Sequence, residues 1–111
     1  FQAGKAATES GRRKIAQAAT PDDAKLLGRR VRMREDWDDV RVAWMRKVVS
    51  AKFARGREEA EVLLATGNAK LVEGTLWHDD YWGVDLEEPG RPGKNHLGRL
   101  LMAQRTKLRR R

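Results

Sequence analysis

Acidic and aromatic side chains are crowded between residues 71 and 83. The acids are Glu73, Asp79 and Asp80, and the rings are Trp77, Tyr81 and Trp82. A carboxylate beside an aromatic wall can have its pKa raised by desolvation, which suits a general acid or base. It can also stabilise the positive charge that grows on a sugar carbon as a glycosidic bond breaks. The rings can stack on a nucleobase, or they can fill the core between helices.

The neighbouring acids Asp79 and Asp80 are expected to differ in role. On an extended segment their side chains point in opposite directions, so only one of them is expected to face a ligand. The alternative is that both are turn residues, and the spacing alone favours this interpretation. Trp82 is followed by Gly83, which indicates a close backbone approach and favours the wall of a pocket.

A loop rich in proline and glycine, residues 87–93, follows these acids and leads into a predicted helix. Lys94 and Asn95 stand where that helix begins, and its free N–H groups and dipole suit a phosphate. Asn95 can equally be a simple helix cap. The two histidines, His78 and His96, lack the spacing of metal ligands. We therefore predict structural or solvent-facing roles for both and no metal site.

The composition fits a single domain. The chain has 111 residues, of which 40% are hydrophobic and 36% charged. No apolar run has the length of a membrane span, and the start of the chain lacks the pattern of a secretory signal. The absence of cysteine excludes a disulfide framework and a thiolate metal site. We expect a cytoplasmic location and no membrane partner.

The net charge is +8, and basic residues cluster at 11–14, 29–34 and 105–111. Such clusters attract phosphates and nucleic acid in a salt-dependent way that is blind to sequence. The alternative is a solvated face followed by a frayed tail. We expect at most a weak nucleic-acid contact through the basic tail.

Helices are predicted to position these residues. Residues 1–7 are interpreted as the end of a helix, and Thr8 as the cap of the next one. Thr20, with proline and two acids after it, predicts a short helix that presents Leu26 and Leu27 and ends at Gly28.

Asp36 is predicted to cap the longest helix, which Gly56 ends. Its apolar positions recur at helical spacing and predict the spine of the core rather than a cofactor site. They are Trp37, Val40, Val42, Trp44, Met45, Val48, Val49, Ala51 and Phe53.

The second half of the chain is predicted to hold two helices and two short strands. A helix spans 57–65 and ends at Gly67, and 70–75 and 81–86 are strand candidates. Residues 94–110 form the last helix, with Leu97, Leu100, Leu101, Gln104 and Leu108 on one face. The fold class is mainly α with a small β component (α+β).

The order of several short motifs resembles the NADAR (YbiA-like) superfamily. The motifs are Phe1-Gln2-Ala3-x-Lys5, Pro21…Ala24-Lys25…Gly28-Arg29, Asp36-Trp37…Met45…Lys52-Phe53, Leu64-x-Thr66-Gly67, Leu71-Val72-Glu73, Asp79-x-Tyr81-Trp82-Gly83 and Gly93-x-Asn95-x-Leu97-Gly98-x-x-Leu101-Met102…Arg105. The chain resembles about the C-terminal two-thirds of the family domain. We expect residues 1–111 to be one such domain with its N-terminal part missing.

The resemblance implies an N-glycosidase, a hydrolase that needs neither a metal nor a cofactor. Its substrate would be a ribosylamine phosphate of the riboflavin pathway, or ADP-ribosylated guanine in nucleic acid. The implied fold, mainly α with a few short strands, agrees with the pattern read from the residues.

The resemblance also implies site residues. Lys5 matches a lysine whose amine can form a Schiff base with the sugar if burial lowers its pKa. Glu73 and Asp79 match acids for electrostatic or acid–base work. The implied substrate-binding residues are Trp37, Trp82, Gly83 and Asn95, with Trp82 stacking and Asn95 holding ribose or phosphate.

Two departures from the family pattern leave alternatives open. The family places a Glu-His pair just before the position of Phe1, and Asp85 replaces a usual glycine. One alternative is a non-catalytic binder of ADP-ribose-like ligands or nucleic acid. Another is an inactive domain fragment.

Overall fold

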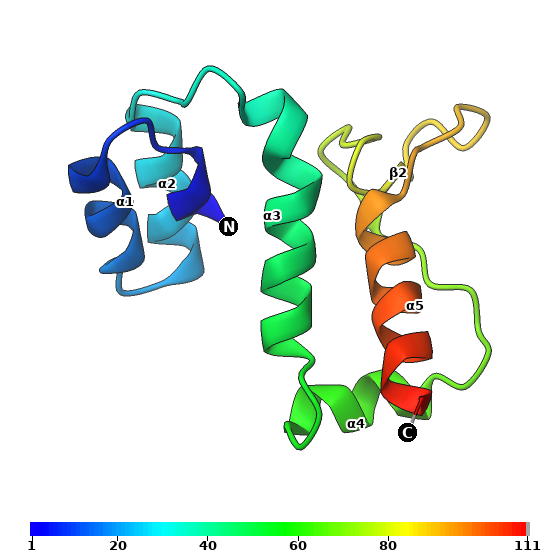
Figure 1. The fold of residues 1–111 in the computed structure, drawn as a ribbon. Helices are drawn as coiled ribbons and strands as arrows, with labels where there is room; N and C mark the ends of the chain where they lie inside the picture. The colour runs from blue at the N-terminus through cyan, green and yellow to red at the C-terminus, as the bar shows by residue number, and fades with distance from the viewer. Residues whose placement is uncertain (111) are drawn as a thin grey trace. The chain divides into compact units, whose positions relative to one another are not determined.

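The computed structural model describes residues 1–110. Eight elements follow one another along the chain (Figure 1): η1 (Gln2–Lys5), α1 (Glu9–Ala16), α2 (Pro21–Arg30), α3 (Trp37–Lys52), α4 (Glu58–Ala65), β1 (Gly74–Thr75), β2 (Val84–Asp85) and α5 (His96–Arg109). The predicted class, mainly α with a small β component, is confirmed. No helix within these residues is long and apolar enough to cross a membrane.

The chain divides into two compact units, Phe1–Met45 and Arg46–Arg111, and the boundary falls within α3. Each unit has its own packing and is described separately below. The expectation of one family domain over the whole chain stays a prediction.

Local capping signals set the helices of the first unit. The Thr8 hydroxyl accepts a hydrogen bond from Gly11 N at 3.1 Å, and the Thr20 hydroxyl accepts one from Asp23 N at 3.1 Å. Each satisfies a backbone donor that the first turn of a helix leaves open. Ile15 of α1 is buried. Both predicted helix starts are therefore confirmed.

The predicted end of α2 at Gly28 is wrong, because the helix continues to Arg30. Gly28 is buried, and a Cβ there would lie 2.5 Å from Oε1 of Gln2 in η1. This glycine makes room for a neighbouring element rather than ending the helix. Leu26, expected on the inner side, is exposed.

The start of the chain and the segment before α3 also differ from expectation. Residues 2–5 form a short 3₁₀ helix, after which Ala6 makes an antiparallel bridge with Met33. Helix α3 begins at Trp37, directly after Asp36 as predicted. The Asp36 carboxylate, however, accepts hydrogen bonds from the Arg34 guanidinium at 2.5 and 2.9 Å.

The second unit is built on α4 and α5. Ala60 and Leu63 of α4 pack with Leu108 of α5, and a ring of half-buried residues surrounds them: Phe53, Leu64, Leu71 and Leu101. The predicted end of α4 at Gly67 is confirmed, since the helix ends at Ala65 and Gly67 has a positive φ of 63°. The predicted end of α3 at Gly56 is wrong, because that helix ends at Lys52 and Gly56, with φ 87°, lies in the turn before α4.

The small sheet lies in the same unit. Strand β1 pairs in parallel with β2, with Gly74 opposite Val84 and Thr75 opposite Asp85. Thr75 and Asp85 are almost fully buried, at 0% and 2% exposure. The short pair therefore holds together the loops that carry the candidate site.

Candidate functional site

Glu73, the acid immediately before β1, has both of its backbone polar groups fixed. Its carbonyl accepts a hydrogen bond from Val84 N at 2.7 Å, and its N–H donates to Oδ1 of Asn95 at 2.9 Å. The backbone at Glu73 is therefore held between β2 and the start of α5.

Asn95 occupies the N-cap position of α5 with φ 51°, in the left-handed region. Its side chain makes no capping hydrogen bond. Instead Oδ1 accepts from Glu73 N, and Nδ2 donates to the carbonyl of Leu71 at 2.9 Å. The side chain is buried, with 7% exposure. The predicted start of α5 is thus displaced by two residues, and the asparagine side chain binds another segment of the chain.

Two glycines allow this close meeting of segments. A Cβ on Gly83 would lie 2.9 Å from Cβ of Glu73, and one on Gly98 would lie 2.5 Å from Oδ1 of Asn95. Both distances are too short for any real side chain. The close backbone approach that was predicted at Gly83 is present, and the approaching group is Glu73.

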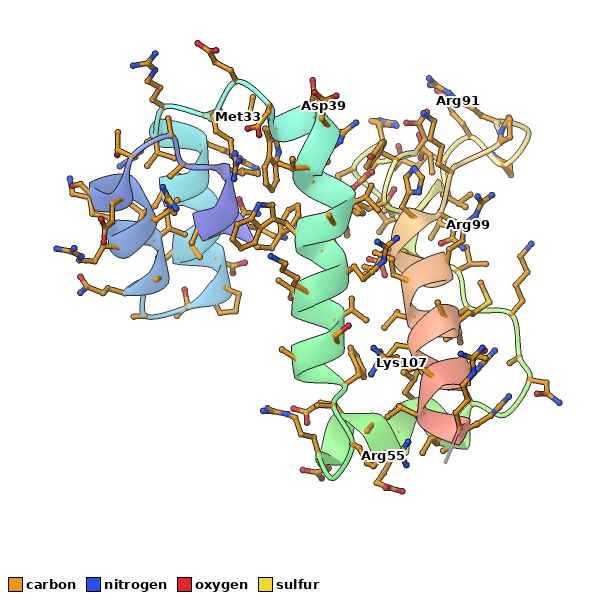
Figure 2. All side chains as sticks on the ribbon, in the orientation of Figure 1. Met33, Asp39, Arg55, Arg91, Arg99 and Lys107 are labelled. Atoms are coloured by element: carbon orange, nitrogen blue, oxygen red, sulfur yellow. The ribbon has the colours of Figure 1, made fainter. Side chains whose placement is uncertain are left out.

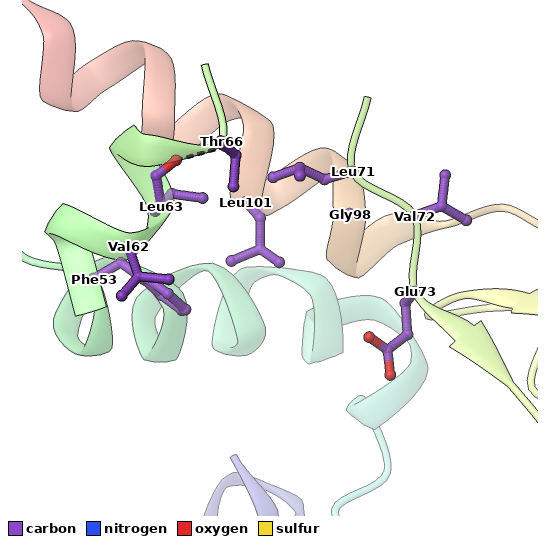
Figure 3. A pocket seen from close by; sticks show the side chains of 9 residues that line it. All are labelled: Phe53, Val62, Leu63, Thr66, Leu71, Val72, Glu73, Gly98 and Leu101. Carbon is purple, nitrogen blue, oxygen red and sulfur yellow. Dashed lines mark hydrogen bonds between the residues drawn. The ribbon is translucent and has the colours of Figure 1, made fainter. Parts of the chain in front are cut away.

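A hollow of about 230 Å³ lies beside this junction. Its lining is Phe53, Val62, Leu63, Thr66, Leu71, Val72, Glu73, Gly98 and Leu101. Figure 3 shows Glu73 at one end of the hollow and Phe53 and Val62 at the other. Glu73 is the one charged residue of this lining, so a carboxylate borders an apolar space.

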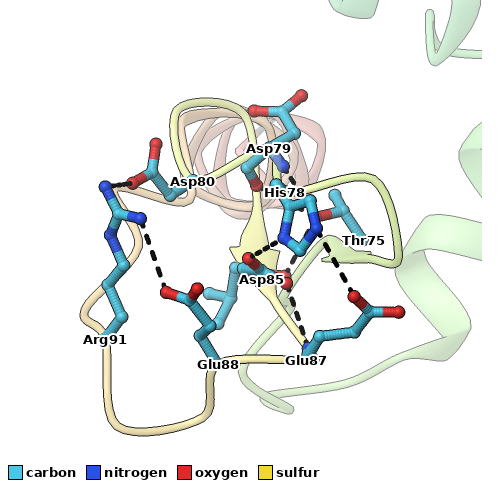
Figure 4. Close-up of polar contacts among 9 residues, drawn as sticks. Thr75, His78, Asp79, Asp80, Asp85, Glu87, Glu88 and Arg91 are labelled. Carbon is cyan, nitrogen blue, oxygen red and sulfur yellow. Dashed lines mark hydrogen bonds and ion pairs between the residues drawn. The ribbon is translucent and has the colours of Figure 1, made fainter.

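Asp79 and Asp80 act as turn residues, the alternative that the spacing favoured. Oδ1 of Asp79 accepts from Tyr81 N at 3.0 Å and from Trp82 N at 2.9 Å. Asp80 pairs with Arg91 at 3.2 Å. These bonds hold the turn that carries Trp82 (Figure 4 shows both acids). Asp79 does not line the hollow described above.

The aromatic side chains of this turn form a cluster. Tyr81 and Trp82 pack edge to face at 5.0 Å between ring centroids, and His96 lies 4.5 Å from Tyr81. Trp82 is half-buried. Trp77 is 64% exposed and lies outside the core.

His78 forms an ion pair that the sequence did not predict. Its Nδ1 lies 2.7 Å from Oδ2 of Asp85, and its Nε2 lies 3.5 Å from Glu87 (Figure 4). The hydrogen bond to Asp85 raises the pKa of the His78 imidazole, and the same bond lowers the pKa of the Asp85 carboxyl. The signal in the sequence was Asp85 itself, an acid near His78.

Some of these groups could serve as metal ligands. His78, Asp85 and Glu88 each offer an atom, and these atoms lie within 4.8 Å of one another. Asp85 is already engaged by His78 and by Glu87 N. The contacts therefore describe an ion-pair network, and the absence of a metal stays a prediction.

The remaining candidates, Lys5 and Trp37, belong to the first unit. Burial lowers the pKa of the Lys5 amine, and the positive charge of Arg29 lowers it further. This is the shift that a lysine nucleophile requires. Trp37 is 4% exposed and packs against Phe1 at 5.2 Å between ring centroids. Its observed contacts are those of a core residue.

The basic C-terminal segment is helical up to Arg109, so these residues do not form a frayed tail. Arg105 is buried, and it donates to Thr66 Oγ1 at 2.7 Å and to the Ala69 carbonyl at 2.8 Å. Arg109 donates to Asn68 Oδ1 and to the Gly67 carbonyl. These arginines stabilise the end of α4 against α5, which leaves fewer charges for a partner.

Comparison with known proteins identifies relatives along almost the whole chain. The NADAR domain family matches residues 1–109. The chain is 41% identical to N-glycosidase YbiA of Escherichia coli over 110 residues, which is 97% of this chain and 66% of YbiA. It is 41% identical to N-glycosidase Npun_R5314 of Nostoc punctiforme, over 86% of this chain and 60% of that protein.

Two further relatives extend the comparison. The riboflavin biosynthesis protein PYRR of Arabidopsis thaliana is 37% identical over 84% of this chain, and the match covers 16% of PYRR. The solution NMR structure of E. coli YbiA superposes with a TM-score of 0.82 at 41% identity, covering 97% of this chain and 63% of YbiA. The chain therefore spans slightly less than two thirds of the bacterial N-glycosidases that it matches.

Proposed function

Because the chain belongs to the NADAR domain family, we propose that it is an N-glycosidase that hydrolyses the bond between a ribose and a base or amine. Two relatives that are named N-glycosidases share 41% of the aligned residues with it. The observation that carries the proposal is the position of Glu73. The Glu73 backbone is held by hydrogen bonds, and its carboxylate borders an apolar hollow where an oxocarbenium-like charge can be stabilised.

The substrate class follows from the relatives. Proteins named for riboflavin biosynthesis are similar to most of this chain, which supports a ribosylamine phosphate as substrate. ADP-ribosylated guanine is the second candidate substrate. If ADP-ribosylated guanine is the substrate, we expect the basic tail to make a weak contact with the nucleic acid. A cytoplasmic location is proposed for either substrate.

Lys5 is the proposed nucleophile. Its neutral amine attacks the anomeric carbon, the bond from that carbon to nitrogen breaks, and the base leaves with a proton supplied by a carboxylic acid. The lysine–sugar adduct returns one proton from nitrogen to the carboxylate. The bond from the anomeric carbon to the ring oxygen then breaks as the remaining nitrogen proton moves to that oxygen, which gives an imine. Water hydrolyses the imine, which releases the sugar and restores the lysine. The lowered pKa of Lys5 supports this role, because more of the amine is neutral near pH 7.

The other implied residues complete the proposal. Asp79 holds the turn of Trp82, and Trp82 stacks on the base from the edge of its aromatic cluster. Trp37, Gly83 and Asn95 remain predictions as substrate-binding residues. The contacts of Gly83 and Asn95 support a different role, in holding the Glu73 backbone.

The test is base release by purified protein from two probes, a ribosylamine phosphate and ADP-ribosylated guanosine. We expect release from at least one probe, and we expect Glu73→Gln to lower kcat by about 100-fold or more. Glu61→Gln, at an exposed position of α4, is the matched control and should retain full activity.

Two results would overturn the proposal. One is a wild-type protein that releases base from neither probe. The other is full activity in Glu73→Gln. Binding of ADP-ribose without any turnover would instead favour the non-catalytic binder.

A further inference from the structure

The backbone at Glu73 is held by one side chain, that of Asn95. Of the two polar groups in the Glu73 backbone, the carbonyl is bound by Val84 N in the β1–β2 pair, as in any strand. The N–H is bound by Oδ1 of Asn95, a residue 22 positions away in the sequence. Removing this side chain would leave a half-buried N–H without its partner.

Both polar atoms of the Asn95 side chain bind this segment. Nδ2 donates to the Leu71 carbonyl, so one amide group bridges the residues on both sides of Val72. An asparagine that precedes a helix ordinarily accepts a hydrogen bond from the first turn of that helix. Here no such bond forms, and the 7% exposure leaves little of the side chain for a ligand.

Two glycines keep the amide in this position. Gly98 lies against both polar atoms of Asn95, and Gly83 lies against the backbone and side chain of Glu73. Any larger residue at either site would push the amide or the strand away. The three segments therefore meet in one arrangement, with the Glu73 side chain directed to the hollow (Figure 3).

From this geometry we propose that Asn95 is a positioning residue, which fixes the Glu73 carboxylate at the hollow and does not itself contact the substrate. Gly83 and Gly98 serve the same arrangement by leaving it room. The proposal rests on the glycosidase function above and assigns the role of three residues within it. Loss of the Asn95 bridge should misplace the carboxylate, which lowers kcat and leaves KM nearly unchanged.

Asn95→Asp is the most selective variant. The carboxylate can still accept from Glu73 N, but it has no hydrogen to donate to the Leu71 carbonyl, and the two oxygens repel. A negative charge at the start of α5 is favourable for the helix, so folding should be retained. We expect kcat to fall by about 100-fold with KM within about twofold. Asn68→Asp, on the exposed loop after α4, is the matched control.

A double-mutant cycle with Glu73→Gln separates positioning from direct contact. If Asn95 acts through Glu73, the variant carrying both changes should be no slower than Glu73→Gln alone. If Asn95 contacts the substrate itself, the losses should multiply and KM should rise, which would overturn the proposal.

Amide hydrogen exchange gives a readout that does not depend on turnover. The Glu73 N–H should exchange slowly in the wild-type protein and faster in Asn95→Ala, with no change in Asn68→Ala. Fast exchange in the wild type would overturn the bridge itself. Absence of turnover by the wild type would overturn both the function and the positioning role, whereas turnover with multiplying losses would overturn the positioning role alone.

Discussion

At the scale of single residues, the Lys5 amine predicts how activity depends on pH. Its pKa is lowered by burial and by the charge of Arg29, and only the neutral amine is a nucleophile. The kcat/KM should therefore rise with pH through this lowered pKa. Arg29→Gln should move the rise to higher pH, because removing a neighbouring positive charge makes the amine easier to protonate.

The measurement is a pH–rate profile with the substrate probe that gives turnover. Arg30→Gln, at the next exposed position of α2, should leave the profile in place. Lys5→Met should lower kcat/KM by on the order of 1000-fold or more. A profile that does not respond to Arg29→Gln would contradict the nucleophile assignment.

At the scale of elements, Arg105 joins α5 to the end of α4. Its guanidinium makes hydrogen bonds to Thr66 Oγ1 and to the Ala69 carbonyl while the residue is buried. Arg105→Met should keep the packing of the aliphatic stem but leave the Ala69 carbonyl and the Thr66 hydroxyl without this donor. We expect a loss of about 2–4 kcal/mol in the free energy of unfolding, measured by urea denaturation.

The matched control lies on the same helix. Arg99 is exposed on α5 (Figure 2), and Arg99→Met should change the free energy of unfolding by no more than about 0.5 kcal/mol. Equal effects of the two substitutions would mean that Arg105 contributes only as a surface charge.

At the scale of the whole molecule, the His78–Asp85 pair predicts how stability depends on pH. The raised pKa of His78 means that its contribution is complete below its ordinary pKa of about 6.5 and is lost as pH rises through the raised value. The lowered pKa of Asp85 means that its contribution is complete above about pH 4 and is lost as pH falls through the lowered value. The two statements describe one ion pair, which is strongest between these limits.

The measurement is the melting temperature between about pH 5 and about pH 9. In His78→Gln the decrease on the alkaline side should be smaller than in the wild type, because the glutamine does not lose a charge. Glu87 and Glu88 also face His78 and raise its pKa, so Glu87→Gln should weaken the same effect. If the melting temperature of His78→Gln falls at alkaline pH as much as that of the wild type, the decrease comes from other titrating groups.

Much of the local structure was predictable, since it depends on contacts within one helical turn. Thr8 and Thr20 cap the helices that follow them, and Gly67 has the positive φ that ends α4. The buried face of α5 also agrees with its spacing, at Leu100, Gln104 and Leu108. Each signal lies within a few residues of the structure that it sets.

The errors arose where a residue's partner is distant in the sequence. Gly28 was interpreted as a helix end, but it is a contact site for Gln2. Asn95 was interpreted as a helix cap or a ligand contact, but its side chain binds Leu71 and Glu73. The same residue type suits both roles, and only the neighbouring segment selects one of them.

The sequence by itself determined the helical architecture, the family resemblance and the set of polar residues from which a site can be built. Only the tertiary structure decided what those residues do: Asn95 bridges Leu71 and Glu73, Asp85 holds His78, and Glu73 borders the hollow. The physical reason is the distance along the chain over which each interaction acts. Helix propensity and capping act over one turn, whereas hydrogen bonds between loops depend on which segments the folded chain brings together.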